Sequence, residues 1–532
     1  MPGGPAWFLF AIARGTACST FFFLPKNMRS NRFDILFCVL IAVLCLVVFG
    51  GAVSYGFLGN WDDGVFVVEN TELALTWHNF LRYLLHPFQD LWTPLPMYSL
   101  MLDRALVGLS PAWYHLHNIL LHTICALLLY AILRKLECAP WLALIGALLW
   151  MLNPQKVESV AWITERKDVL CGALAFGAVL AFLHERSYCA AILSFLAIAA
   201  KPAAIALPGM FLVIWWMRRA PLRDWRRYVI PSLGGVLAFV VSAVITAQTN
   251  PGKLEKMVAV PIHNLFWYPL TALVPFEVNP IYPEVIPLDA RFWGVVVGGA
   301  MLTLVGCLLV HYLGYGGRQY FGMLLLIGGN ILPVLGLLHY TNFRYCDRYN
   351  YLVSAVVITA VALLAARLQP LMRRAWILPS VGVVLAAFFA VLSLQYLPNW
   401  SNCRYISLYA IESAGKPNRK AVEMALYVAF AEDNFGMLDY VKKALRERPM
   451  YDEGLKYVNP NLLRLIDAHS AMRRKDYATA KAKYQEIFAT VVNGELHLAV
   501  NFFPTVYGDA AILAELEGDH ARAAFYRKQA EK

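Results

Sequence analysis

The sequence predicts an all-α protein that combines a polytopic membrane helix bundle with a smaller helical domain outside the membrane. Of its 532 residues, 59% are hydrophobic and 15% are charged, and the mean hydropathy is +0.53. Both values lie far from those of soluble globular domains. Charge is also uneven along the chain, because residues 397–532 hold 36 of the 81 charged residues. We therefore expect a membrane domain over 34–396 and a soluble domain over 397–532.

Apolar runs long enough to form membrane helices predict about eleven crossings. The run 262–280 contains three prolines and is expected to lie at the interface instead. The eleven runs are 35–57, 113–133, 141–157, 169–183, 189–200, 203–217, 229–247, 291–312, 320–338, 349–366 and 375–396.

Basic residues of the loops predict the orientation. With eleven crossings, they gather on one side of the membrane, which is the pattern of cytoplasmic loops. The outer loop 58–112 and the C-terminal domain are then extracytoplasmic. The expected location is the inner (plasma) membrane of the cell, crossed many times.

Two terminal segments have separate interpretations. Segment 1–33 has short apolar stretches interrupted by Arg14, and we expect an interfacial segment or one outside the native protein, whose start would be Met28. A cleaved signal peptide is the alternative, although no clear small-residue cleavage site follows an apolar core. The C-terminal sequences RRKDYATAKAKYQEIF and LAELEGDHARAAFYRKQAEK carry the small-residue and aromatic spacing of tetratricopeptide-like helix pairs. An irregular array of helical hairpins is the alternative.

Composition also excludes several classes of function. The net charge of +11 is explained by loop bias and lipid headgroups, so no nucleic-acid partner is expected. The ten cysteines form no CxxC pair and no cluster with histidine at zinc spacing, so no metal site is expected.

Adjacent carboxylates open the first outer loop, in the sequence GNWDDGVFVVEN. Asp62 and Asp63 follow the first membrane helix directly. Two like charges at a membrane surface raise the pKa of a carboxylate, which then suits a general base. A solvated turn, in which one aspartate caps the following segment, is the alternative.

Polar residues inside the second apolar run share one helical face. His115, Asn118 and His122 are spaced i, i+3 and i+7, while His117 points elsewhere. Such residues line a cavity inside a bundle or form hydrogen bonds that pack helices together.

Three further groups of charges fall near expected helix ends. The turn NPQKVESVAWITERKDVL holds six, among them Glu158, Arg166 and Asp168, and either grips a phosphate or forms an ordinary charged exit turn. Lys201 is isolated between apolar runs and is a functional candidate. Arg344 and Arg348 stand at an outer helix mouth, where they bind an anion or anchor the helix end.

These segments together resemble a known family, the bacterial relatives of the transmembrane and tetratricopeptide-repeat-containing O-mannosyltransferases within the GT-C glycosyltransferase superfamily. The resemblance covers about residues 60–350 and includes WDDGVFVVEN, LNPQKVESVAWITERKDVL, AAKPAAIALP and DRYNYL. Asn153 and Lys156 depart from it, standing where the family commonly has histidines.

The resemblance implies a GT-C-type glycosyltransferase that moves a sugar from a polyprenyl-phosphate carrier to a protein or glycan acceptor on the outer face. It makes Asp62 or Asp63 the base. The implied phosphate ligands are Arg166, Lys201, Arg348 and Arg344, and the implied pocket residues are Glu158, Asp168, His122, Asn118 and His115. No cofactor is required, although a divalent cation is compatible with the chemistry.

Two other classes of function remain open. A flippase or transporter for polyprenyl lipids would use the same charges along a path through the bilayer, but the sequence has no visible inverted repeat. A non-catalytic scaffold would bind peptides through its helical repeats and would tolerate loss of both aspartates.

Overall fold

The computed structural model describes residues 32–249, 253–254, 258–282, 286, 288–339, 344–413, 419–447, 458–489 and 503–530. Nearly all of the segment 1–33 therefore lies outside the described residues. The chain divides into two compact units. The first comprises residues up to 57, 65–278 and 285–400, and the second comprises 58–64, 279–284 and 401–532.

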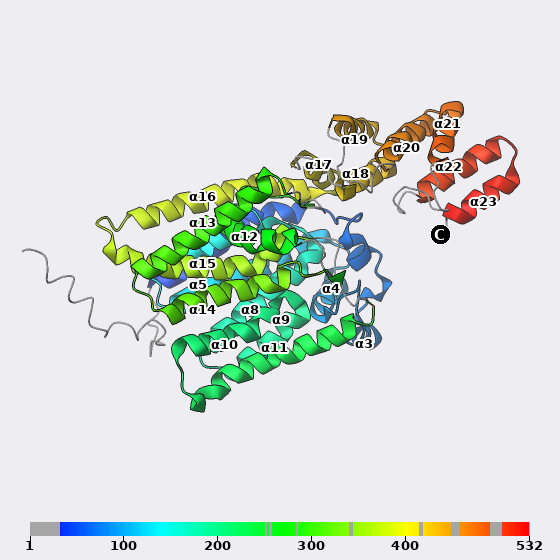
Figure 1. Ribbon diagram of the computed structural model, residues 1–532. Coiled ribbons are helices and arrows are strands. Elements are labelled where there is room, and N and C mark those ends of the chain that lie inside the picture. The colour runs from blue at the N-terminus through cyan, green and yellow to red at the C-terminus, as the bar shows by residue number, and fades with distance from the viewer. Residues whose placement is uncertain are drawn as a thin grey trace, which may run out of the picture. The chain divides into compact units, whose positions relative to one another are not determined.

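The first unit is a bundle of apolar helices, most of which run nearly parallel or antiparallel to one another (Figure 1). A helix overlaps each of the eleven predicted runs, and a twelfth, α12, overlaps the run expected at the interface. The helices are α2 (Arg32–Phe49), α5 (Pro111–Lys135), α6 (Pro140–Met151), α8 (Arg166–Leu183), α9 (Ser187–Ala200), α10 (Ala206–Arg218), α11 (Trp225–Thr246), α12 (Ala259–Leu273), α13 (Ala290–Tyr312), α14 (Gly317–Ile331), α15 (Asn350–Leu368) and α16 (Ile377–Tyr396).

Among the described residues of this unit, six helical segments are long and apolar enough to cross a membrane, and three shorter helices are also apolar. The predicted all-α, multi-pass membrane bundle is confirmed. The number of eleven crossings stays a prediction, as does the orientation. The six segments are Arg32–Ser54, Pro111–Lys135, Leu222–Thr246, Ala290–Tyr312, Asp347–Leu371 and Ile377–Ser401.

Small residues let the helices of the bundle approach closely, as in other membrane bundles. A Cβ atom added to Gly234 on α11 would lie 2.3 Å from the Ala191 carbonyl oxygen on α9. A Cβ on Gly382 of α16 would lie 2.6 Å from the Ile145 side chain on α6. These contacts fix neighbouring helices at distances that a larger residue would not permit.

Short helices cover one end of the bundle. Within the predicted outer loop 58–112 lie the turns η2 (Gly64–Val68) and η3 (Thr71–Leu73) and the helices α3 (Trp77–Leu85) and α4 (Pro94–Val107). Leu73, Tyr83, Met97 and Met101 pack there in a small core of their own. A two-residue antiparallel pairing joins β1 (Lys253–Leu254) to β2 (Leu338–His339).

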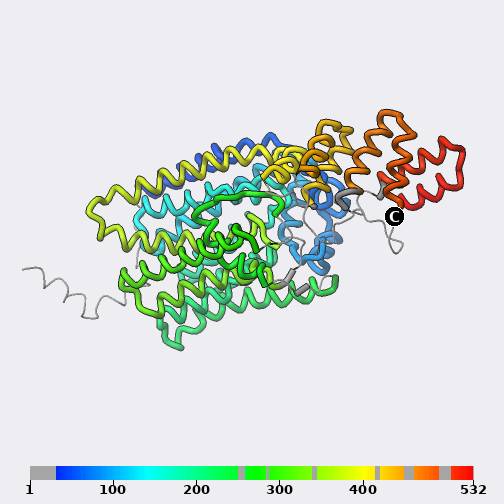
Figure 2. The backbone as a smooth tube through the Cα atoms, turned by 45° about the horizontal axis from the view of Figure 1, so that its top comes forward, coloured from blue at the N-terminus to red at the C-terminus, as the bar shows by residue number. Residues whose placement is uncertain are grey.

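The second unit consists mainly of C-terminal helices packed as successive antiparallel neighbours (Figure 2). Asn279 joins it through a 2.9 Å hydrogen bond from its Nδ2 to Ser413 Oγ. The tetratricopeptide-like identity of this unit stays a prediction. Its helices are α17 (Cys403–Ser413), α18 (Arg419–Ala431), α19 (Phe435–Glu447), α20 (Val458–Arg473), α21 (Tyr477–Phe488), α22 (Phe503–Leu516) and α23 (His520–Ala530).

Candidate active site

The charged turn between α6 and α8 is folded into the protein. The chain passes through α7 (Lys156–Ala161) and η4 (Ile163–Glu165) before α8 begins. Asn153 starts this turn by accepting a hydrogen bond of 3.0 Å from the Gln155 N–H. Lys156 and Glu158 have no exposed surface. The turn is thus a buried element and not a solvent-exposed connection.

Arg348 reaches this turn from the short helix η8 (Asp347–Tyr349). Its backbone N–H donates to Glu158 Oε2 over 3.0 Å, and its guanidinium forms an ion pair with the same carboxylate. Arg348 Nε also lies 3.3 Å from Glu165 Oε1. One arginine therefore bridges two buried glutamates that are seven positions apart.

Glu165 lies among three cations. Besides Arg348, Lys167 Nζ lies 3.1 Å and Lys201 Nζ 3.7 Å from its oxygens. Neither oxygen has a hydrogen bond of good geometry to the described residues. Lys201 also pairs with Asp168, whose second oxygen accepts a 3.0 Å hydrogen bond from Ser159 Oγ. We call the set Glu158, Glu165, Lys167, Asp168, Lys201 and Arg348 the charge cluster.

The cluster lies at one end of the bundle, where α6 and α9 finish and α8, α10 and α15 begin. The carboxylates of the cluster are buried, and its two lysines are more accessible. The side chains of Glu158 and Glu165 are 0% exposed, whereas those of Lys167 and Lys201 are 17% and 13% exposed. A molecule approaching the cluster meets positive charge first.

Burial raises the pKa of each cluster carboxylate, and the neighbouring charges decide whether the final shift is upward or downward. Burial raises the pKa of Glu158 above its ordinary value despite Arg348. Burial, opposed by Lys201 and reinforced by the Glu165 charge, raises the pKa of Asp168 to about 7. Burial would also raise the pKa of Glu165, but Lys167, Lys201 and Arg348 lower it. When Asp168 is protonated near neutral pH, the three cations outnumber the remaining anions.

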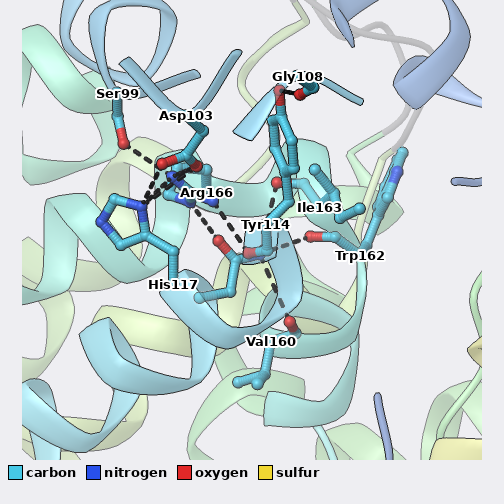
Figure 3. A network of polar contacts seen from close by, with 10 residues as sticks. Ser99, Asp103, Gly108, Tyr114, His117, Val160, Trp162, Ile163 and Arg166 are labelled. Carbon is cyan, nitrogen blue, oxygen red and sulfur yellow. Dashed lines mark hydrogen bonds and ion pairs between the residues drawn. The ribbon is translucent and has the colours of Figure 1, made fainter. Parts of the chain in front are cut away.

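Arg166, the first residue of α8, belongs to a separate network (Figure 3). Its Nη1 donates to Ser99 Oγ and Asp103 Oδ2, both at 2.8 Å, and its Nη2 donates to the Tyr114 carbonyl oxygen at 3.0 Å. Its Nε donates to Asn118 Oδ1. The side chain has no exposed surface, so its donors are engaged by the protein itself.

Asp103 completes this network from α4. His117 Nδ1 lies 2.9 Å from Asp103 Oδ1. Burial raises the pKa of Asp103, but the hydrogen bond from His117 and the charge of Arg166 lower it below its ordinary value overall. The carboxylate is therefore held ionised opposite the guanidinium.

The polar face predicted on α5 is buried along its whole length, and each of its residues reaches a different element. His122 Nε2 donates to the Met151 carbonyl oxygen over 3.1 Å, which leaves Nδ1 to accept from the Tyr351 hydroxyl at 2.7 Å. Asn118 Nδ2 donates to the Trp162 carbonyl oxygen at 3.1 Å. His115 Nε2 lies 3.4 Å from the Gly56 carbonyl oxygen. These side chains join helices and support the charged turn.

The two aspartates of the first outer loop fall in the second unit. Asp63 is fully buried and accepts a 2.9 Å hydrogen bond from the Leu58 N–H, as expected of an aspartate that stabilises a turn. Asp62 is half-buried. Arg344 is also half-buried, and its carbonyl oxygen accepts a 3.0 Å hydrogen bond from Asn264 Nδ2.

Several site residues received no role from the sequence. Glu165 and Lys167 were visible only as members of the charged turn. Trp162 contacts two cations, because Arg348 lies 5.4 Å and Lys167 5.9 Å from the centre of its ring. Ser99 and Asp103 are spaced i, i+4, which places them on one helical face. This spacing is the sequence pattern that could have indicated their shared role.

An apolar cavity of about 130 Å³ extends between α5, α8, α10, α14 and α15. Ala204 and Leu352 line it, three residues after Lys201 and four after Arg348 respectively. One helix turn thus separates the apolar lining from two cations of the cluster. Other lining residues include Leu129, Ile132, Phe176, Leu207 and Ala355.

Neither the protein-family models nor the curated proteins match this chain. Among solved structures, one match is ArnT from Cupriavidus metallidurans bound to undecaprenyl phosphate. The identity is 15%, the TM-score is 0.30, and the match covers 94% of this chain and 76% of that one. At this level of similarity no residue role is carried from that protein to this chain. Within the described segments, no group of three His, Cys, Asp or Glu residues is placed to hold a metal ion.

Proposed function

We propose that this protein is a GT-C-type membrane glycosyltransferase that transfers a sugar from a polyprenyl-phosphate carrier to a protein or glycan acceptor outside the cytoplasm. The observation that carries the proposal is the difference in exposure within the charge cluster. Its carboxylates are buried, while the side chains of Lys167 and Lys201 are partly accessible. Positive charge of this kind, placed at one end of a membrane bundle, suits the phosphate of a lipid carrier.

The neighbouring apolar cavity supports a lipid as the bearer of that phosphate. The cavity begins one helix turn from Lys201 and Arg348, and its named lining is almost entirely aliphatic or aromatic. Isoprenoid units gain free energy by leaving water for such a surface. The carrier chain would therefore enter between α10 and α15 while its phosphate contacts the cations.

The transfer itself needs a base and a stabilised leaving group. The acceptor hydroxyl attacks the anomeric carbon of the sugar, and the bond from that carbon to the phosphate oxygen breaks, leaving its electron pair on the phosphate. Lys201, Arg348 and Lys167 stabilise the charge that develops there. The acceptor proton passes to a carboxylate, for which we propose Asp62.

The local contacts of the two aspartates motivate this choice. Asp63 is buried and accepts from the Leu58 N–H, which gives it a role in forming the turn. Asp62 is the more accessible of the two. Arg166, whose donors contact other protein groups, positions α4 and α5 against α8 in this scheme.

Purified full-length protein in lipid nanodiscs tests the activity. A panel of polyprenyl-phosphate sugars is offered, and release of polyprenyl phosphate and glycosylated products are followed by mass spectrometry. We expect Asp62→Asn to lower the rate about a hundredfold with little change in donor affinity, because the base acts only in the transition state.

Asp63→Asn is the matched control, since it removes an adjacent carboxylate. It should reduce the rate less and lower stability more. An Asp62/Asp63 double variant that turns over donor at the normal rate would remove the enzymatic role of this loop and favour the scaffold hypothesis.

A further inference from the structure

A second polar site lies at the opposite end of the bundle from the charge cluster. It is an open pocket of about 600 Å³ between the end of α10, the loop that follows α10 and the start of α14. The cluster lies beside the first residues of α10 and the pocket beside its last, so about 20 Å of helix separates them. The pocket is lined by Leu212, Trp215, Trp216, Arg219, Ala220, Leu222 and Arg318.

The two arginines of this pocket have no acidic partners among the described residues. The acids nearby are engaged elsewhere, because Asp224 lies 3.9 Å from Arg223 and Glu185 lies 2.7 Å from Arg227. Arg318 instead stacks over Trp216, with its guanidinium carbon 5.1 Å from the ring centre. Two uncompensated guanidinium groups therefore face one cavity.

The backbone around the pocket is held in a specific shape. Arg219 has φ 51° and ψ 33°, a left-handed conformation that ends α10 and that favours glycine over arginine. Trp215 Nε1 donates to the Ala220 carbonyl oxygen over 3.1 Å, and the ring of Trp215 stacks on Tyr228. The arginine thus occupies a strained position that its neighbours fix, as is common at binding sites.

The close approach of α10 and α14 fixes the other wall. A Cβ atom on Gly322 would lie 2.3 Å from the Met217 side chain, so a larger residue there would have to displace this methionine. The spacing keeps Arg318, four residues earlier on α14, beside Trp216 on α10.

The apolar part of the lining indicates a ligand that is itself partly apolar. Leu212, Trp216 and Leu222 are 41%, 42% and 78% exposed, although they stand next to arginines. Tryptophan beside arginine at a helix end is typical of the boundary between hydrocarbon and headgroups. A free, fully hydrated anion would gain nothing from these surfaces.

We propose that this pocket binds an anionic phospholipid, with its phosphate between Arg219 and Arg318 and its acyl chains against Leu212 and Trp216. The predicted orientation places this end on the cytoplasmic side, where anionic lipids attract basic groups. The site is separate from the charge cluster and does not depend on the proposed glycosyl transfer.

Thermal unfolding of the full-length protein in neutral detergent, with added lipid, tests the proposal. Phosphatidylglycerol should raise the Tm by about 3 °C more than phosphatidylcholine at equal concentration, because a ligand of the folded state stabilises it. Arg219→Gln/Arg318→Gln should lose this difference. Arg223→Gln/Arg226→Gln removes two nearby charges that do not line the pocket, and this control pair should keep the difference.

Other outcomes overturn the proposal. A difference retained by Arg219→Gln/Arg318→Gln, or lost equally in the control pair, would mean that the pocket is not the site. Glycerol 3-phosphate raising the Tm as much as phosphatidylglycerol would mean that the acyl chains are not recognised. If the glutamine pair does not fold, Arg219→Lys/Arg318→Lys keeps the charges and should still prefer phosphatidylglycerol, and equal responses to both lipids would contradict the site.

Discussion

Arg166 and Glu165 are neighbours in the chain and both are fully buried, yet their surroundings are opposite. Arg166 donates hydrogen bonds of 2.8 to 3.0 Å to Ser99, Asp103 and the Tyr114 carbonyl oxygen. Glu165 has three cations within 3.1 to 3.7 Å but no hydrogen bond of good geometry among the described residues.

We interpret the difference as that between a structural network and the proposed phosphate-binding site. Buried polar groups whose hydrogen bonds are all made rigidify a fold, whereas a buried group without them calls for another explanation. In the charge cluster, Lys201 and Arg348 do hydrogen-bond to Asp168 and Glu158, but Glu165 has no such bond among the described residues, and Lys167 and Lys201 are partly exposed. An incoming phosphate could therefore contact these two lysines, whereas Arg166 is fully buried.

The largest expected effect comes from breaking the Arg166 network. Arg166→Gln leaves Asp103 buried without its cation, so the free energy of unfolding should fall by about 3 to 5 kcal/mol. Chemical denaturation in detergent measures this, with the exposed Arg223→Gln as control. A variant that keeps wild-type stability but no longer binds donor would identify Arg166 as a phosphate ligand. The distinction between the Arg166 network and the charge cluster would then be wrong.

Substitutions in the charge cluster should lower the transfer rate. When the partner charge is removed as well, they should lower the free energy of unfolding much less. Arg348→Gln is expected to slow transfer about a hundredfold, because a cation that stabilises the leaving phosphate is lost. It also leaves Glu158 unpaired, which destabilises the protein. Glu158→Gln/Arg348→Gln should recover stability but not rate, and recovery of both would show that the pair is only structural.

Proton uptake by the cluster should be visible in donor binding. Since the pKa of Asp168 is raised to about 7, lowering the pH through 7 protonates it and leaves the cluster with excess positive charge. Affinity for a polyprenyl phosphodiester, which does not titrate here, should rise severalfold from pH 8 to pH 6. Asp168→Asn should remove that pH dependence. If the variant keeps the pH profile of the wild type, a group other than Asp168 causes the dependence.

The smallest effect is expected at the rim of the Arg166 network. His117 is 34% exposed and contacts Asp103, which Arg166 also neutralises. His117→Ala should therefore lower the free energy of unfolding by only about 1 kcal/mol. A loss as large as that of Arg166→Gln would mean that the histidine, and not the arginine, supports the carboxylate.

The sequence predicted the membrane bundle well, because long apolar runs leave a chain few alternatives. It also located the charged turn and the i, i+3, i+7 face of His115, Asn118 and His122. The sequence did not show that Arg166 and Lys167 belong to different networks. Adjacent helical residues point about 100° apart, and the contacts of each side chain depend on the elements that pack against the helix. Glu165 acquired its surroundings from Lys201 and Arg348, which lie far along the chain.

Donor affinity measured by native mass spectrometry on folded protein tests the central contrast most directly. The probe is a polyprenyl-phosphate sugar, compared among wild type, Lys201→Gln/Asp168→Asn and Arg166→Lys, where the last two keep the local charge balance. We expect the Lys201 pair to bind at least about tenfold more weakly and Arg166→Lys to bind as wild type does. Unchanged binding in the Lys201 pair together with weakened binding in Arg166→Lys would contradict the account.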